Sequence, residues 1–233
     1  MAIDLLAFGP HPDDVELGMG GTLARHSSQG HATAIIDLTR GEMGSNGTPA
    51  ERIAEGEAAA RILGCQWRRN LGLPDRNLDH RDPEQLLRVV NAIRAAQPQV
   101  VAVNGSVDRH PDHVAAHRLL QEALFSAGLR RYETELPPFR PTKVVYYFIN
   151  DEQEPSFYVD ITPHWQQKSE SLFAHRSQFQ PAEGGVETRL NGAVGLPYLI
   201  ESRDRFFGAK VGVPFAEGFI VTGPRLVADL LSF

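Results

Sequence analysis

The residues with the clearest chemical potential lie in two short segments rich in histidine and aspartate. The first segment, FGPHPDDVE (residues 8–16), contains His11, Asp13 and Asp14. The second segment is DRHPDH (residues 108–113). Imidazole and carboxylate groups held on rigid elements bind divalent metals, and a further carboxylate can take a proton from water. The two segments together predict one shared site of a metal-dependent hydrolase.

The residue types suggest how these roles are divided. We expect His11, Asp14 and His113 to bind the metal, because a catalytic zinc typically has three protein ligands and an open position. Asp13 is adjacent to one of these ligands and is not assigned as a ligand itself. It is therefore the candidate base that deprotonates the water.

His110 and Asp112 are two residues apart, and a carboxylate that fixes the tautomer of an imidazole is common beside metal sites. A protonated His110 can stabilise an oxyanion or donate a proton to a leaving amine. Asp14 and Asp112 also stand where helices are expected to begin, so each is equally compatible with a helix cap. Three histidines and four aspartates in the two segments favour a functional site over caps.

The elements that position these segments follow from hydrophobic periodicity. Short β-rich runs alternate with helical patterns, which predicts an α/β fold with a mostly parallel sheet and helices on both faces. The expected strands are residues 3–8, 32–38, 66–71, 99–103, 143–149, 157–161 and 215–221. The expected helices are residues 15–29, 48–63, 82–95, 112–128 and 162–173. Ligands in open α/β sheets bind beyond the carboxyl ends of the strands, where both His/Asp segments begin.

Composition narrows the class of protein. A length of 233 residues with 42% hydrophobic residues fits a single globular domain over residues 1–233. The net charge of -6 argues against a nucleic-acid-binding surface. The single cysteine, Cys65, cannot form an intrachain disulfide and is expected to be a buried filler rather than a nucleophile. We expect a cytoplasmic protein, because neither a signal peptide nor a membrane-spanning segment of roughly 20 apolar residues is evident.

Two further segments require interpretation. GMGG at residues 18–21 lacks the spacing of nucleotide-binding fingerprints and falls inside an expected helix, where small residues allow close packing onto the sheet. Residues 180–197 are polar, contain glycine and are long enough to form a mobile loop. Such a loop can close over a substrate.

The paired motifs HPDD and HPDH resemble the LmbE-like or PIG-L family of zinc-dependent deacetylases, which act on N-acetylglucosamine-containing substrates. Further segments resemble the bacterial subgroup that deacetylates N-acetylglucosaminyl malate during bacillithiol synthesis. They are TRGEMGSNGTPAER, LGLPDRNLD, EALFSAGLRRY, HRSQF and FFGAKVGVPFAEGF. The resemblance extends from Phe8 to Leu231 and implies a Rossmann-like α/β fold.

Carried over residue by residue, the resemblance implies the same roles that the chemistry suggests. It implies zinc at His11, Asp14 and His113, a general base at Asp13, and an oxyanion or acid role for His110 oriented by Asp112. The sequence departs from the family pattern at Pro10, where a small residue such as Ala is expected before the histidine. It also has Asp108 where some relatives use a tyrosine to stabilise the oxyanion.

Substrate contacts are assigned from charge. A malate-bearing glycoside carries two carboxylates, and arginine is the side chain best suited to bind a carboxylate with two hydrogen bonds. Arg52, Arg76 and Arg109 lie in or beside the motif segments and are the candidates. A solvated or ion-paired arginine is an equally good interpretation of each one separately.

The predicted reaction is metal-assisted hydrolysis of an acetamide, which yields acetate and a free glucosamine conjugate. The expected cofactor is Zn2+, with Fe2+ or another divalent metal as the alternative, and the expected partner is a second copy of the chain. A deacetylase of another N-acetyl sugar, such as N-acetylglucosamine or a chito-oligosaccharide, is the nearest alternative function. A non-haem iron oxygenase and a non-catalytic sugar-binding module are more distant alternatives.

Overall fold

The computed structural model describes residues 3–180 and 183–223. Two expectations reach beyond these residues. The family resemblance continues to Leu231, and the polar segment at residues 180–197 includes residues 181–182. Those parts of both expectations lie outside the described residues.

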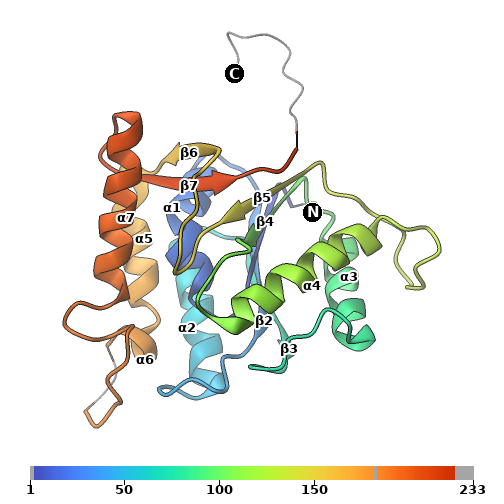
Figure 1. Ribbon diagram of the computed structural model, residues 1–233, viewed down its shortest axis with the longest axis horizontal. Helices are drawn as coiled ribbons and strands as arrows, with labels where there is room; N and C mark the ends of the chain where they lie inside the picture. The colour runs from blue at the N-terminus through green and yellow to red at the C-terminus, as the bar shows by residue number, and fades with distance from the viewer. Residues whose placement is uncertain (1–2, 181–182, 224–233) are drawn as a thin grey trace.

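The chain folds around one seven-stranded sheet (Figure 1). The strands are β1 (Leu5–Gly9), β2 (Thr33–Thr39), β3 (Trp67–Leu73), β4 (Val100–Asn104), β5 (Lys143–Tyr147), β6 (Phe157–Asp160) and β7 (Ala216–Ile220). Their order in the sheet is β3-β2-β1-β4-β5-β7-β6. The first five strands are parallel, and β7 runs antiparallel to both of its neighbours. The predicted mostly parallel sheet is confirmed.

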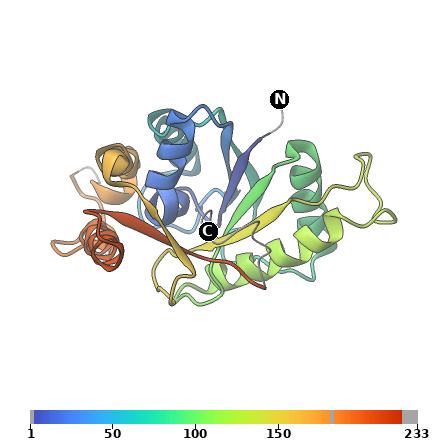
Figure 2. The same cartoon turned by 90° about the horizontal axis from the view of Figure 1, so that it is seen from above.

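Helices cover both faces of the sheet (Figure 2). They are α1 (Asp14–Ser28), α2 (Pro49–Ile62), α3 (Pro83–Ala96), α4 (Pro111–Ala127), α5 (Trp165–Phe173), α6 (Arg176–Phe179) and α7 (Leu196–Val211), with a 3-10 turn η1 (Thr162–His164) before α5. Alternate residues of β1 divide the core, since Leu6 and Phe8 pack towards α3 and α4 while Leu5 and Ala7 pack towards α1. None of the helices described is long and apolar enough to cross a membrane.

Helix α7 was not predicted from the sequence. It begins with Leu196 and Pro197 and ends before Gly212, which has a φ of +77°. A proline in the first turn and a glycine with positive φ after the last turn are recognised boundary signals of a helix. The helical periodicity of apolar residues is hard to recognise within α7, because Arg203 and Asp204 occupy buried positions where apolar residues are usual.

The GMGG segment packs closely, as predicted. A Cβ atom at Gly18 would lie 2.1 Å from the ring of Tyr147, and one at Gly21 would lie 2.7 Å from the side chain of Ile161. Glycine is therefore required for α1 to approach the sheet.

Helix α1 is also kinked inside this segment, where Met19 has non-helical angles (φ -152°, ψ 22°). The kink leaves backbone N–H groups of the following turn without helical partners. The buried carboxylate of Glu217 on β7 accepts hydrogen bonds from the N–H groups of Gly21 (3.0 Å) and Thr22 (2.7 Å). Glu217, a residue of strand β7, thus caps the second half of α1.

Candidate active site

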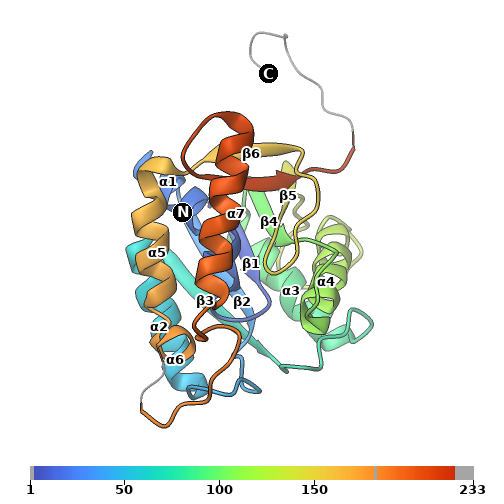
Figure 3. The same ribbon diagram turned by 60° about the vertical axis from the view of Figure 1, so that its left-hand side comes forward.

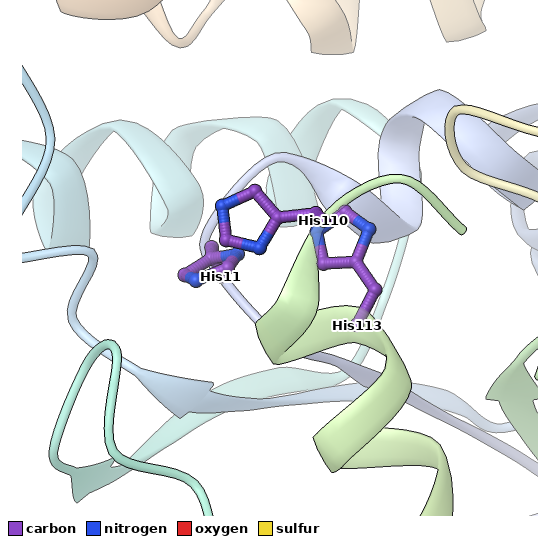
Figure 4. A group of neighbouring side chains, drawn as sticks. All are labelled: His11, His110 and His113. Atoms are coloured by element: carbon purple, nitrogen blue, oxygen red, sulfur yellow. The ribbon is translucent and has the colours of Figure 1, made fainter.

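The carboxyl ends of β1 and β4 open into one cavity of about 300 Å³. The loop after β1 contributes His11, Asp13 and Asp14 to its lining, and the loop and helix start after β4 contribute His110 and His113. Figure 4 shows the three imidazoles gathered in one place. The topology thus brings together two segments that are distant in the sequence, because β1 and β4 are parallel neighbours.

Asp14 lies between two of the imidazoles. Its Oδ2 atom is 3.1 Å from Nδ1 of His11 and 3.3 Å from Nε2 of His113. Burial acts to raise the pKa of Asp14, but the interactions with His113 and His11 outweigh it and hold this pKa well below its usual range. One ionised carboxylate oxygen facing two imidazole nitrogens is a donor set that suits a divalent transition metal.

The other nitrogen of each of these imidazoles faces a carboxylate. Nδ1 of His113 is 3.0 Å from Asp108, and Nε2 of His11 is 3.2 Å from Asp75 and 3.4 Å from Asp112. Imidazoles that bind metals usually have such an outer carboxylate, which fixes the tautomer and the ring orientation. The surroundings of both rings therefore fit residues that hold a metal.

His110 occupies the N-cap position of α4, and its Nδ1 accepts a hydrogen bond from the backbone N–H of Asp112 (3.2 Å). The ring stacks on His113 with a centroid distance of 4.6 Å. Because Nδ1 is an acceptor, a neutral His110 carries its proton on Nε2. Burial, and then the nearby His113 and His11, lower the pKa of His110 below its ordinary value. This direction opposes the protonated His110 that we expect from the sequence.

The relation between His110 and Asp112 also differs from the expected one. The carboxylate of Asp112 accepts a hydrogen bond from the backbone N–H of Arg76 (2.6 Å) and lies near His11. Only the backbone of Asp112 hydrogen-bonds to His110. The carboxylate of Asp112 therefore serves Arg76 and His11, which lie far away in the sequence, and not His110 two residues before it.

Alternative groupings of ligands are possible within this cluster. Nitrogen atoms of His11, His110 and His113 all lie within 4.8 Å of one another. The same holds for ligand atoms of His11, Asp75 and Asp112. His11 belongs to both groups, so either grouping among the described residues would hold a metal close to this side chain.

Asp13 presents a buried carboxylate from a strained backbone. Its φ of 115° lies in the left-handed region, and it occupies the N-cap position of α1 without capping the helix through its side chain. Instead, its Oδ2 atom lies 3.3 Å from Nη2 of Arg52. Burial raises the pKa of Asp13 to about 6, against the opposing effect of the Arg52 charge. A carboxylate held in this way is well suited to accept a proton.

The helix-cap interpretation does not describe Asp14 or Asp112. Neither carboxylate accepts a hydrogen bond from the first turn of its own helix in the part of the chain that the structure describes. Asp14 accepts from the backbone N–H of His11 (2.9 Å), and Asp112 accepts from Arg76. Both carboxylates are therefore directed to the His/Asp cluster.

The three candidate arginines line the same cavity but differ in their surroundings. Arg52 is buried and donates to the carbonyl oxygens of Gly41 (2.9 Å) and Pro12 (2.8 Å), besides its contact with Asp13. Its donors thus support the motif loop. Arg76 is half-exposed and lies 3.4 Å from Asp112, whereas the exposed guanidinium of Arg109 has no acceptor among the residues described.

Several residues of the site were missed in the sequence. Asp75 and Asn150 follow β3 and β5, so the rule that ligands lie beyond the carboxyl ends of parallel strands would have found both. Asn150 donates to Asp108 (3.0 Å). Gln178 also lines the cavity, and no pattern in the sequence indicated it, whereas residues 188–190 belong to the segment 180–197 that was expected to lie over a substrate.

Comparison with known proteins agrees with this geometry. Residues 6–124, more than half of the chain and including both His/Asp segments, match the family model of GlcNAc-PI de-N-acetylase (PIG-L). A crystal structure of a conserved protein from Thermus thermophilus is similar, with a TM-score of 0.86 and 44% identity over 98% of each chain.

Two curated relatives have named activities. The chain is 29% identical to a diacetylchitobiose deacetylase from Thermococcus kodakarensis over 190 residues, which cover 75% of this chain and 70% of that protein. It is also 29% identical to a probable N-acetyl-α-D-glucosaminyl L-malate deacetylase from Bacillus anthracis, over 73% of this chain and 79% of that protein.

Proposed function

This chain belongs to the PIG-L family, and from that premise we propose that it is a metal-dependent hydrolase that removes the acetyl group from an N-acetylglucosamine conjugate. The observation that carries the proposal is the position of Asp13. Its carboxylate is buried beside the His11, Asp14 and His113 cluster and opens onto the same cavity. A site that only bound sugar would have no need of a strained, buried base next to a metal-binding set.

We assign the metal to His11, Asp14 and His113, and zinc suits this set of two nitrogens and one oxygen. When bound, the ion supplies Lewis acidity, which polarises an acetamide carbonyl and makes a water molecule more acidic. His110 is assigned to the substrate, because its Nδ1 is already an acceptor and its Nε2–H remains as a donor.

The remaining chemistry belongs to the side chains. Asp13 takes a proton from the water, whose oxygen forms a bond to the acetamide carbon. The Nε2–H of His110 donates a hydrogen bond to the developing oxyanion. As the carbon–nitrogen bond breaks, the proton held by Asp13 passes to the departing amine, so that acetate and the free amino sugar leave.

For the conjugate itself we propose N-acetylglucosaminyl malate. The resemblance of the quoted sequence segments to this subgroup supports it, as does the similarity to the Bacillus anthracis relative. The arginines at the cavity also support it, since Arg76 and Arg109 offer guanidinium groups to the malate carboxylates. Arg52 is better suited to hold Asp13 and its loop.

The test is an acetate-release assay. N-acetylglucosaminyl malate, N,N'-diacetylchitobiose and free N-acetylglucosamine are compared with and without a chelator, and the chelated protein is then reloaded with zinc. We expect the malate conjugate to have the highest kcat/KM and the chelator to abolish turnover reversibly. Acetate release from none of the three substrates would contradict the proposal, and oxygen uptake by the metal-loaded protein would point to an oxygenase.

A further inference from the structure

One wall of the cavity comes from a segment that is distant from both motifs in the sequence. Residues 183–195 precede α7, which stands beside α5 at the edge of the molecule (Figure 3). The cavity is lined by Thr188, Arg189 and Leu190 of this segment. Its position therefore decides what the cavity can accept.

A buried asparagine attaches this segment to the loop between β2 and α2. The side-chain Nδ2 of Asn46 donates to the carbonyl oxygen of Val186 (2.8 Å), and its Oδ1 accepts from the N–H of Val186 (2.8 Å). The pair of bonds fixes both the distance and the orientation of the backbone at Val186. Asn46 is itself held, because Gln178 donates to its backbone oxygen (2.7 Å).

The segment is also bonded internally on both sides of Arg189. Asn191 donates to the carbonyl oxygen of Val186 (3.1 Å) and accepts from the N–H of Thr188 (2.7 Å). The N–H of Leu196, at the start of α7, donates to the carbonyl oxygen of Arg189 (2.9 Å). Hydrogen bonds thus fix the backbone on both sides of Arg189.

The side chain of Arg189 is available for a ligand. It is exposed and lines the cavity, and its guanidinium has no hydrogen bond or ion pair within residues 3–180 and 183–223. Arg52 and Arg76 differ, because both have protein acceptors. Arg189 and Arg109 are therefore the two cavity arginines whose guanidinium groups are unpaired in the described structure.

We infer that Arg189 is a specificity-determining residue that binds a carboxylate on the non-sugar part of the substrate, and that Asn46 positions it. The inference rests on the proposed function and refines its substrate class to N-acetylglucosaminides with an anionic substituent. A carboxylate accepts two parallel hydrogen bonds from a guanidinium, which neutral hydroxyl groups do not match. Neutral substrates therefore gain little from Arg189.

The first test is R189Q, assayed on N-acetylglucosaminyl malate and on neutral N,N'-diacetylchitobiose. Loss of a hydrogen bond to a charged group predicts a KM for the malate conjugate that rises by about 10- to 100-fold with little change in kcat. Kinetics on the neutral substrate should be unchanged. R131Q, on an exposed residue remote from this cavity, is the control. An equal effect of R189Q on both substrates would overturn the inference.

The second test addresses Asn46. N46A should raise the KM for the malate conjugate while preserving turnover of the neutral substrate, and N46A/R189Q should be no worse than R189Q alone. Additive effects in the double variant would refute the positioning role. Calorimetric binding of the product glucosaminyl malate against glucosamine, to wild type and R189Q, separates this inference from the proposed function. Absent turnover refutes only the latter, and an unchanged ratio of affinities refutes only the role of Arg189.

Discussion

Nδ1 of His113 lies 3.0 Å from Oδ2 of Asp108, and both side chains are 3% exposed. The carboxylate also accepts hydrogen bonds from the backbone N–H of His110 (2.8 Å) and from Asn150 (3.0 Å). These bonds hold the carboxylate of Asp108 in place independently of its contact with the His113 ring. A proton held on Nδ1 by Asp108 leaves the Nε2 lone pair directed at Asp14, where a metal would be bound.

This relationship predicts that D108N weakens metal binding. Loss of an outer carboxylate typically lowers metal affinity by about 10- to 100-fold. A competition titration with a chromophoric chelator measures the change directly and does not depend on turnover. D79N, at a half-exposed aspartate outside the cluster, should bind as tightly as wild type. An unaltered affinity in D108N would show that His113 does not need this partner.

Asp13 and His113 should separate catalysis from metal binding. We expect D13A to retain one equivalent of metal and to lose about 10²- to 10⁴-fold in kcat, because it removes the proposed base but no ligand. H113A should lose the metal itself. Metal content after gel filtration and initial rates of acetate release provide the two readouts. Near-normal hydrolysis by D13A would require another base.

His110 can be tested against its alternative role as a ligand. If it donates to the oxyanion, H110A should keep the wild-type metal content and lose about 10²- to 10³-fold in kcat. If it completes the group of three imidazoles, the same variant should lose metal affinity instead. Metal stoichiometry at matched free zinc distinguishes these outcomes.

Cys65 should be unreactive in the folded protein. Burial raises the pKa of its thiol from 9.0 to about 11, so that the thiolate fraction at pH 8 is about 100-fold lower than in the unfolded chain. Alkylation by iodoacetamide at pH 8 should be slower by at least that factor, and it should accelerate as the pH rises towards 11. Mass spectrometry with and without denaturant measures it. Rapid labelling of the native protein would place Cys65 in a more exposed environment.

A buried ion network that joins α5, α7 and β7 should contribute strongly to the free energy of unfolding. Nζ of Lys168 lies 2.5 Å from Asp204 and 2.7 Å from Glu217, and all three side chains are fully or almost fully buried. K168M would leave the buried Glu217 without a counter-charge and Asp204 with only Arg203, 3.7 Å away, and should lower the free energy of unfolding by about 3–5 kcal/mol. K210M, whose lysine pairs with the exposed Glu154, should leave the free energy of unfolding nearly unchanged. Urea denaturation of both variants makes the comparison.

Much of the sheet could be predicted because its signals are local. The apolar runs of the strands and the Pro49 and Pro83 helix starts lie where the structure has them. Helix α7 escaped prediction because its burial of Arg203 and Asp204 depends on partners elsewhere in the chain, including Lys168. Periodicity shows which residues are apolar, and it does not show which charges are neutralised inside the fold.

The sequence determined that the two His/Asp segments meet at the cavity, because parallel strands carry their following loops to the same edge of the sheet. The spacing of these loops predicts His11, Asp14 and His113 there. Only the tertiary structure decided which atoms face one another. The carboxylate of Asp112 contacts His11 rather than the ring of His110, two residues away, and Asp75 comes from the segment after a third strand, β3. Such pairings depend on backbone direction and side-chain rotamers within a few ångströms, and spacing along the chain does not encode these.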